Sequence, residues 1–76
     1  MGELSKADLD AALSDYRAAA VEAVEAARAW HAKLEAGATP SAAEVSEFHS
    51  LGASLNERVT QTWARYCYVS ALAYRL

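Results

Sequence analysis

Apolar residues recur along the first half of the chain in steps that alternate between four and three. The series comprises Leu9, Leu13, Tyr16, Ala20, Ala23, Ala27, Trp30 and Leu34. This alternation is typical of the contact stripe of a coiled coil. Ser5, followed by Asp8 near the positive end of the helix dipole, indicates a helix start, and Gly37 indicates a helix end. The pattern predicts a helix over residues 5–36.

A second stripe with the same alternation runs through the other half of the chain. Its members are Val45, Phe48, Gly52, Leu55, Val59, Thr62, Tyr66, Val69, Ala73 and Leu76. Thr39 as the cap and Pro40 as the first helical residue predict a helix over residues 40–75. An alternative start is Ser41, which would form a capping box with Glu44.

The fold class that follows is all-α, an antiparallel hairpin with a coiled-coil-like contact stripe. The chain 1–76 is a single domain, and its turn over residues 37–39 is short enough to make the two helices antiparallel neighbours. Gly52 costs about 1 kcal/mol relative to alanine inside a helix, and Ser54 with Glu57 could cap a new helix. Because position 52 is in phase with the stripe, we expect one continuous helix whose glycine permits close approach. The alternative is a three-helix unit with a break near Gly52.

The last fifteen residues are apolar around most of the second helix. They hold one of the two tryptophans and three of the four tyrosines, but only two charged residues. The first helix can cover only one side of them, and soluble monomers seldom leave a large apolar patch in water. We therefore expect two hairpins to pair as a homodimeric four-helix bundle. The residues expected at the interface with a second copy or another partner are Trp63, Arg65, Tyr66, Tyr68, Leu72, Tyr74 and Arg75.

The charge and the cysteine content of the chain limit the cellular compartments in which we expect it. The net charge is −3, with a balance of −5 over residues 1–50 and +2 over residues 51–76. Cys67 is the single cysteine, so no disulfide forms within one chain, and a lone cysteine suits a reducing compartment. The start, MGELSKADLD, lacks the apolar core of a signal peptide, and no run approaches the roughly 20 apolar residues of a membrane span. We expect a cytoplasmic protein without a transmembrane segment.

Two histidines are the candidates for metal chemistry. In a hairpin that turns near residue 38, His31 and His49 lie near each other, with Glu35 one turn beyond His31. Such side chains can hold zinc, which would make the chain a metal-dependent helical enzyme. The sequence has neither HExxH nor Glu-x-x-His, and histidines beside a stripe usually keep one edge in water. We therefore expect no metal, no cofactor and no catalysis.

Cys67 is the candidate nucleophile, because a cysteine thiolate can attack a substrate. Formation of the thiolate needs a nearby base, and both histidines lie at the other end of the hairpin. We therefore expect Cys67 to be a packed core residue.

The aromatic and arginine residues of the expected interface are typical of energetic anchors in protein–protein contacts. We therefore expect a non-catalytic, self-associating protein-interaction module. The two stripes and short turn resemble helical-hairpin dimers such as Rop, which bind paired RNA loops. That resemblance implies, as an alternative, a nucleic-acid-binding regulator. The chain lacks the basic face that such binding needs, so we do not expect nucleic acid as a partner.

Composition carries a second resemblance. The chain has 19 alanines, and its five arginines outnumber its two lysines. In this it is similar to small accessory proteins of actinobacterial phages, several of which are cytotoxic because they bind a host protein and impair growth. The resemblance implies that a host or cellular protein is the partner.

Overall fold

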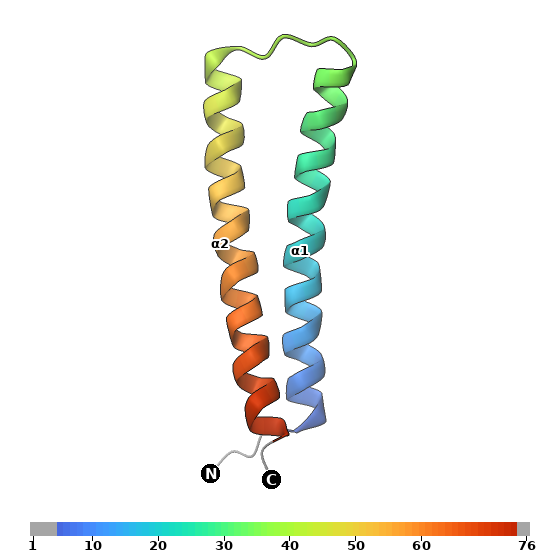
Figure 1. The fold of residues 1–76 in the computed structure, drawn as a ribbon, viewed down its shortest axis with the longest axis vertical. Helices are drawn as coiled ribbons and strands as arrows, with labels where there is room; N and C mark the ends of the chain where they lie inside the picture. Colours follow the sequence, from blue (N-terminus) through green and yellow to red (C-terminus); the bar gives the residue numbers. More distant parts are fainter. Residues whose placement is uncertain (1–4, 75–76) are drawn as a thin grey trace.

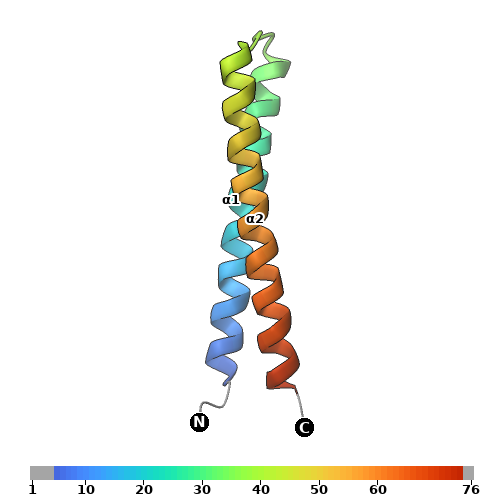
Figure 2. The same cartoon turned by 90° about the vertical axis from the view of Figure 1, so that its left-hand side faces the viewer.

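The computed structural model describes residues 5–74, which form two long helices and one connection. Helix α1 spans Lys6–Glu35 and helix α2 spans Ala42–Ala73. They run antiparallel beside each other and cross at a small angle (Figures 1 and 2). The predicted all-α hairpin is confirmed. The first helix matches its prediction to within one residue at each end, whereas the second begins at residue 42 rather than residue 40.

Reciprocal hydrogen bonds fix both helix starts. The Asp8 carboxylate accepts from the Ser5 N–H at 2.8 Å, and the Ser5 hydroxyl accepts from the Asp8 N–H at 3.3 Å. Ser41 and Glu44 make the same pair of bonds at 3.1 and 3.2 Å. The predicted start at Thr39-Pro40 is therefore wrong and the Ser41 alternative is right. The Ser41 capping box gives two N–H groups a side-chain acceptor, whereas Ala42, three residues after Thr39, has no side chain that could complete such a box there.

Gly37 ends α1 as the sequence predicts. Its φ of +88° lies in the left-handed region, which costs a residue with a Cβ free energy. The Ala38 N–H donates to the Lys33 carbonyl at 3.2 Å, and the Gly37 N–H donates to the Leu34 carbonyl at 3.0 Å. These two bonds define a Schellman motif. The motif reverses the chain and directs it back along α1.

The contact stripe of α1 differs from the prediction at every second position. Ala12 and Ala19 are almost fully buried, whereas Ala27 and Leu34 are exposed. The stripe therefore follows residues 9, 12, 16, 19, 23, 26 and 30. Alanines lie on both candidate rows, so both alternations fit the sequence, and alanine lets two helix backbones approach most closely. On α2, every predicted stripe residue from Val45 to Ala73 is buried or half-buried, and Leu76 lies outside the described residues.

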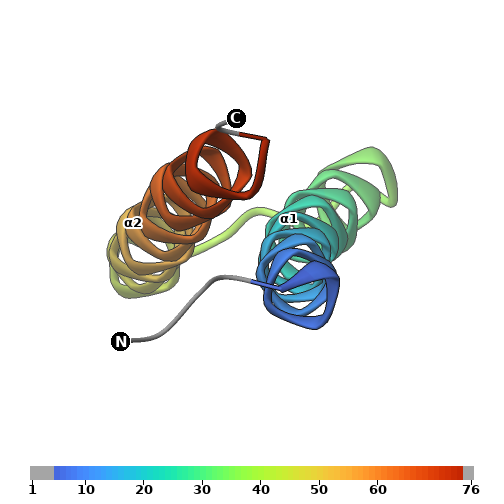
Figure 3. The same ribbon diagram turned by 90° about the horizontal axis from the view of Figure 1, so that it is seen from below.

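Aromatic pairs join the helices on either side of this alanine-lined middle. Trp30 stacks on Phe48 near the connection, with ring centroids 4.4 Å apart and planes 7° apart. Tyr16 meets Trp63 toward the open end, where the chain ends lie. Figure 3, which looks along the hairpin from that end, shows a single pair of helices with no third element over either side.

Gly52 lies inside α2 without interrupting it, so the three-helix alternative is wrong. The expected close approach at this glycine is also wrong. A Cβ placed on Gly52 would meet nothing within 4 Å. The glycine is therefore a local weakness of the helix and not a packing requirement.

Candidate interaction surface

A two-helix hairpin has two broad sides, one on either flank of the contact stripes. In an antiparallel pair, the residues that precede every second stripe position, namely 9, 16, 23 and 30 of α1 and 45, 52, 59, 66 and 73 of α2, lie on the same side of the hairpin. On the first side these residues are Asp8, Asp15, Glu22 and Ala29 of α1 and Glu44, Leu51, Arg58, Arg65 and Leu72 of α2. We call it the charged side, because six of these nine residues are ionised at neutral pH.

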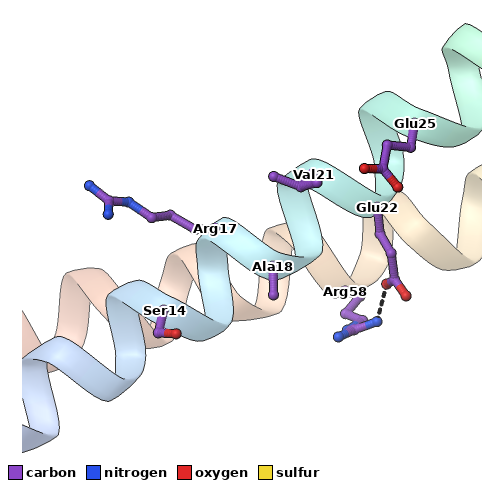
Figure 4. A pocket seen from close by; sticks show the side chains of 7 residues that line it. All are labelled: Ser14, Arg17, Ala18, Val21, Glu22, Glu25 and Arg58. Carbon is purple, nitrogen blue, oxygen red and sulfur yellow. Dashed lines mark hydrogen bonds and ion pairs between the residues drawn. The ribbon is translucent and has the colours of Figure 1, made fainter.

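Ion pairs between the helices confirm that these residues lie together. Arg58 pairs with Glu22 across the hairpin (Figure 4), and the positive charge of Arg65 acts on Asp8. The Glu22–Arg58 pair borders an open depression of about 490 Å³. Arg17 also borders this depression, but its side chain extends away from the pair (Figure 4). The charges of this side are thus largely matched within one chain.

The second side carries a single formal charge in the row next to the stripes, Lys6 at the open end. The row consists of the residues that follow the remaining stripe positions: Lys6, Leu13, Ala20, Ala27 and Leu34 of α1 and Ala42, His49, Asn56, Trp63 and Ser70 of α2. We call it the uncharged side. Trp63 packs here against Tyr16 and Tyr66, with ring centroids 5.0 and 5.8 Å apart, and about half of Trp63 remains exposed.

Two further features extend the apolar surface of the uncharged side. Near the open end, Leu13, Tyr66 and Tyr74 line a depression of about 410 Å³ together with Lys6 and Asp10. Along α1, Val24 lines two shallow depressions, one with Ala20 and one with Ala27, and Arg28 lines both. Apolar side chains therefore follow this side along α1, with charged side chains at its outer edge.

The predicted interface residues divide between the two sides. Trp63, Tyr66 and Tyr74 border the uncharged side, since residues 63, 66, 67, 70 and 74 share one flank of α2. Arg65, Tyr68 and Leu72 border the charged side, on the opposite flank. Arg75 lies outside the described residues.

Sequence reasoning missed several exposed apolar residues in this surface. They are Val21, Val24, Leu34 and Leu51. The sequence contains a sign that Val21, Val24 and Leu51 are exposed, because they are large apolar residues outside both predicted stripes. It contains no such sign for Leu34, because Leu34 is in phase with the predicted contact stripe.

Cys67 is exposed, so its predicted place in the core is wrong. Residue 67 follows the stripe position Tyr66 and therefore points to the outer flank of α2. The apolar neighbours of this cysteine in the sequence gave a misleading signal, because this half of α2 is apolar on more than its contact side.

The capping carboxylates are the groups whose titration the fold changes. Hydrogen bonds from the Ser5 backbone and hydroxyl lower the pKa of Asp8, with a smaller contribution from Arg65. The hydrogen bond from Lys33, which joins the helices at 2.6 Å, lowers the pKa of Glu44, and the Ser41 backbone adds to it. Both carboxylates are solvent-exposed and act as helix caps.

Of the three residues considered as metal ligands, the structure places two close together. His31 Nε2 lies 2.9 Å from Glu35 Oε1, one helical turn along, and both side chains are exposed. His49 instead has Phe48 as its aromatic neighbour, with ring centroids 6.4 Å apart. Among residues 5–74, no three His, Cys, Asp or Glu side chains gather closely enough to hold a metal ion.

Comparison with known proteins gives no relative from which to transfer a function. No family model, curated protein or solved structure matches the chain. In the part of the chain that the structure describes, neither helix combines the length and the apolar character needed to cross a membrane. The physical properties of the two sides remain as the guide to function.

Proposed function

We propose that the chain is a non-catalytic helical interaction module that self-associates, with two hairpins pairing as a four-helix bundle. The observation that carries this proposal is the amount of surface that one hairpin leaves in water. The accessible area is 5821 Å² for 8.2 kDa, about 1,300 Å² more than the about 4,500 Å² of a typical folded monomer of that mass.

The hairpin also buries few large side chains. Among residues 5–74, the almost fully buried ones are Ala12, Ala19 and Val69, and two of these three have only a methyl side chain. Hydrophobic stabilisation scales with the apolar area removed from water, so a core of this kind contributes little. The large apolar residues that stay exposed are Val21, Val24, Leu34, Leu51, Trp63, Tyr68 and Tyr74.

A second copy would supply the missing burial. A standard interface removes about 800 Å² from each partner, which is less than the surface in excess on one hairpin. Pairing through a two-fold axis buries the same residues twice, so each apolar side chain within the interface contributes on both copies.

Light scattering across a dilution series tests self-association. We expect a mass of about 16 kDa, twice the 8.2 kDa of one chain, that falls toward the monomer value on dilution. A mass of 8.2 kDa at every concentration up to about 1 mM would overturn the proposal.

The proposal also includes a cellular protein as partner, bound through Arg65, Tyr68 and Leu72 on the charged side. Tyr68 supports it, because this large aromatic side chain is 66% exposed in the single hairpin. We expect expression of the chain to impair bacterial growth, and we expect Tyr68→Ala with Leu72→Ala to remove this effect while leaving the helical circular dichroism unchanged. Gln61→Ala on the same helix is the control. Loss of helicity in the double variant would instead place the two residues in the core.

A further inference from the structure

We infer that the second copy packs on the uncharged side of the hairpin, so that Leu13, Leu34 and Trp63 enter the centre of the bundle. This inference rests on the proposed self-association and adds to it the side that is buried. The other side, with its ion pairs, then remains on the outside of the dimer.

The distribution of charge distinguishes the two sides. One of the ten residues next to the stripes on the uncharged side is charged, Lys6 at the open end, against six of nine on the charged side. The next row of the uncharged side lies farther from the contact stripes. It comprises Asp10, Arg17, Val24 and His31 of α1 and Ser46, Ala53, Thr60, Cys67 and Tyr74 of α2. Only Asp10 and Arg17 are charged in that outer row. Removing a charge from water is costly, and interface cores are depleted in charged residues.

The same distribution favours a second copy as the occupant. In a two-fold dimer a surface meets itself, so like charges on it would be brought together. The uncharged side brings fewer charges together, and Lys6 at its open end already pairs with Asp10 at 3.8 Å. The charged side would have to desolvate carboxylates and guanidinium groups that already pair within one hairpin, such as Glu22 with Arg58.

Trp63 is a suitable anchor for this contact. It is 49% exposed, yet its ring is already held by Tyr16 and Tyr66. A partly immobilised tryptophan loses little conformational freedom when a partner covers it. Leu34 lies near the connection and Trp63 toward the open end, so the contact would extend along most of the hairpin.

The hairpin contains a matched pair of leucines for testing the inference. Leu34 borders the uncharged side and is 42% exposed, and Leu51 borders the charged side and is 48% exposed. We expect Leu34→Lys to raise the dimer dissociation constant about tenfold or more, because the lysine would have to be buried. Leu51→Lys should leave that constant within about threefold of wild type, as surface substitutions usually do. Sedimentation equilibrium measures both constants, and circular dichroism checks that each variant is folded.

A second pair covers the case in which Leu34→Lys unfolds the hairpin. Val24 and Val21 are 50% and 53% exposed; Val24 lies in the outer row of the uncharged side, and Val21 lies one row farther from the contact stripes, on the outer face of α1. Both are exposed positions inside a helix, where lysine is a better helix former than valine. Val24→Lys should weaken the dimer, and Val21→Lys should not.

The outcomes distinguish the inference about which side is buried from the proposal that the chain self-associates. A wild-type chain that stays monomeric overturns both. A wild-type dimer that Leu51→Lys weakens as much as Leu34→Lys, or that Leu34→Lys and Val24→Lys leave intact, overturns the choice of side while self-association stands.

Discussion

Trp63 of α2 lies against Tyr16 of α1, with ring centroids 5.0 Å apart and planes inclined by 52°. Together with the Trp30–Phe48 stack near the connection, this contact brackets a stretch where α1 faces α2 with alanines. Large rings at both ends, and the methyl groups of α1 against Leu55 and Val59 of α2 between them, set the spacing of the two helices. The central alanines are therefore the positions least able to accept a larger side chain.

Ala19→Leu tests this spacing. Ala19 is almost fully buried, so a leucine would force the helices apart and destabilise the hairpin by about 1–3 kcal/mol. Urea unfolding at one protein concentration measures the change. Ala18→Leu is the control, because Ala18 is exposed and both alanine and leucine favour helix, so its effect should stay below about 0.5 kcal/mol. Equal destabilisation by the two substitutions would contradict the stripe through residues 12 and 19.

The two glycines of the described chain should respond to alanine with opposite signs. Gly52→Ala adds a methyl group that meets nothing within 4 Å inside a helix, so we expect stabilisation of about 1 kcal/mol. Gly37→Ala forces a residue with a Cβ into a φ of +88°, so we expect destabilisation of about 1–2 kcal/mol. Thermal unfolding measures both changes. A lower melting temperature for Gly52→Ala would show that the position is closely packed, for example by a second copy.

Stability should fall as the medium becomes acidic. The pKa values of Asp8 and Glu44 are lowered in the folded chain, below ordinary values of 3.8 and 4.5. A carboxylate with a lowered pKa stabilises the fold above its unfolded pKa, and this contribution is lost as the pH falls through the folded pKa. We therefore expect the melting temperature to be constant near neutral pH and to decrease as the pH drops below about 4.5.

Glu44→Gln combined with Asp8→Asn is the control for the acid effect. The amides keep an oxygen that accepts the capping hydrogen bond but do not titrate in this range. The double variant should lose less stability between pH 7 and pH 3 than the wild type. An equal loss in both proteins would mean that other carboxylates cause the acid sensitivity.

Local signals in the sequence placed both helices, although the preferred start of the second helix at Thr39 was wrong and the alternative at Ser41 was right. Ser5 with Asp8, Ser41 with Glu44 and the left-handed Gly37 each act within a few residues, so their geometry follows from spacing alone. The row of α1 that faces α2 depends instead on which alanines allow the closest contact along the whole hairpin. Because alanines lie on both candidate rows, the larger Leu13 and Leu34 were assigned to the core.

That misassigned row also concealed the candidate surface. Leu13 and Leu34, once placed in the contact stripe, could not be recognised as part of an exposed side. The predicted interface therefore groups the tyrosines and arginines of α2 by their chemical type, although Trp63 and Tyr68 lie on different flanks of the helix. Only the register between the helices shows that the Glu22–Arg58 ion pair, which joins the two helices, lies on one side, whereas the ion pairs bordering the other side, Lys6–Asp10 and His31–Glu35, lie within α1.

Small-angle X-ray scattering on a concentration series tests side-by-side pairing of hairpins most directly, because it gives mass and shape together. One hairpin measures 55 × 18 × 14 Å, with a radius of gyration of 17.1 Å. With two layers about 10 Å apart, we expect the mass to double while the radius of gyration reaches only about 18 Å. A mass that never exceeds that of one chain would contradict the account. So would a doubled mass with a radius of gyration near 30 Å, about the value for hairpins joined end to end.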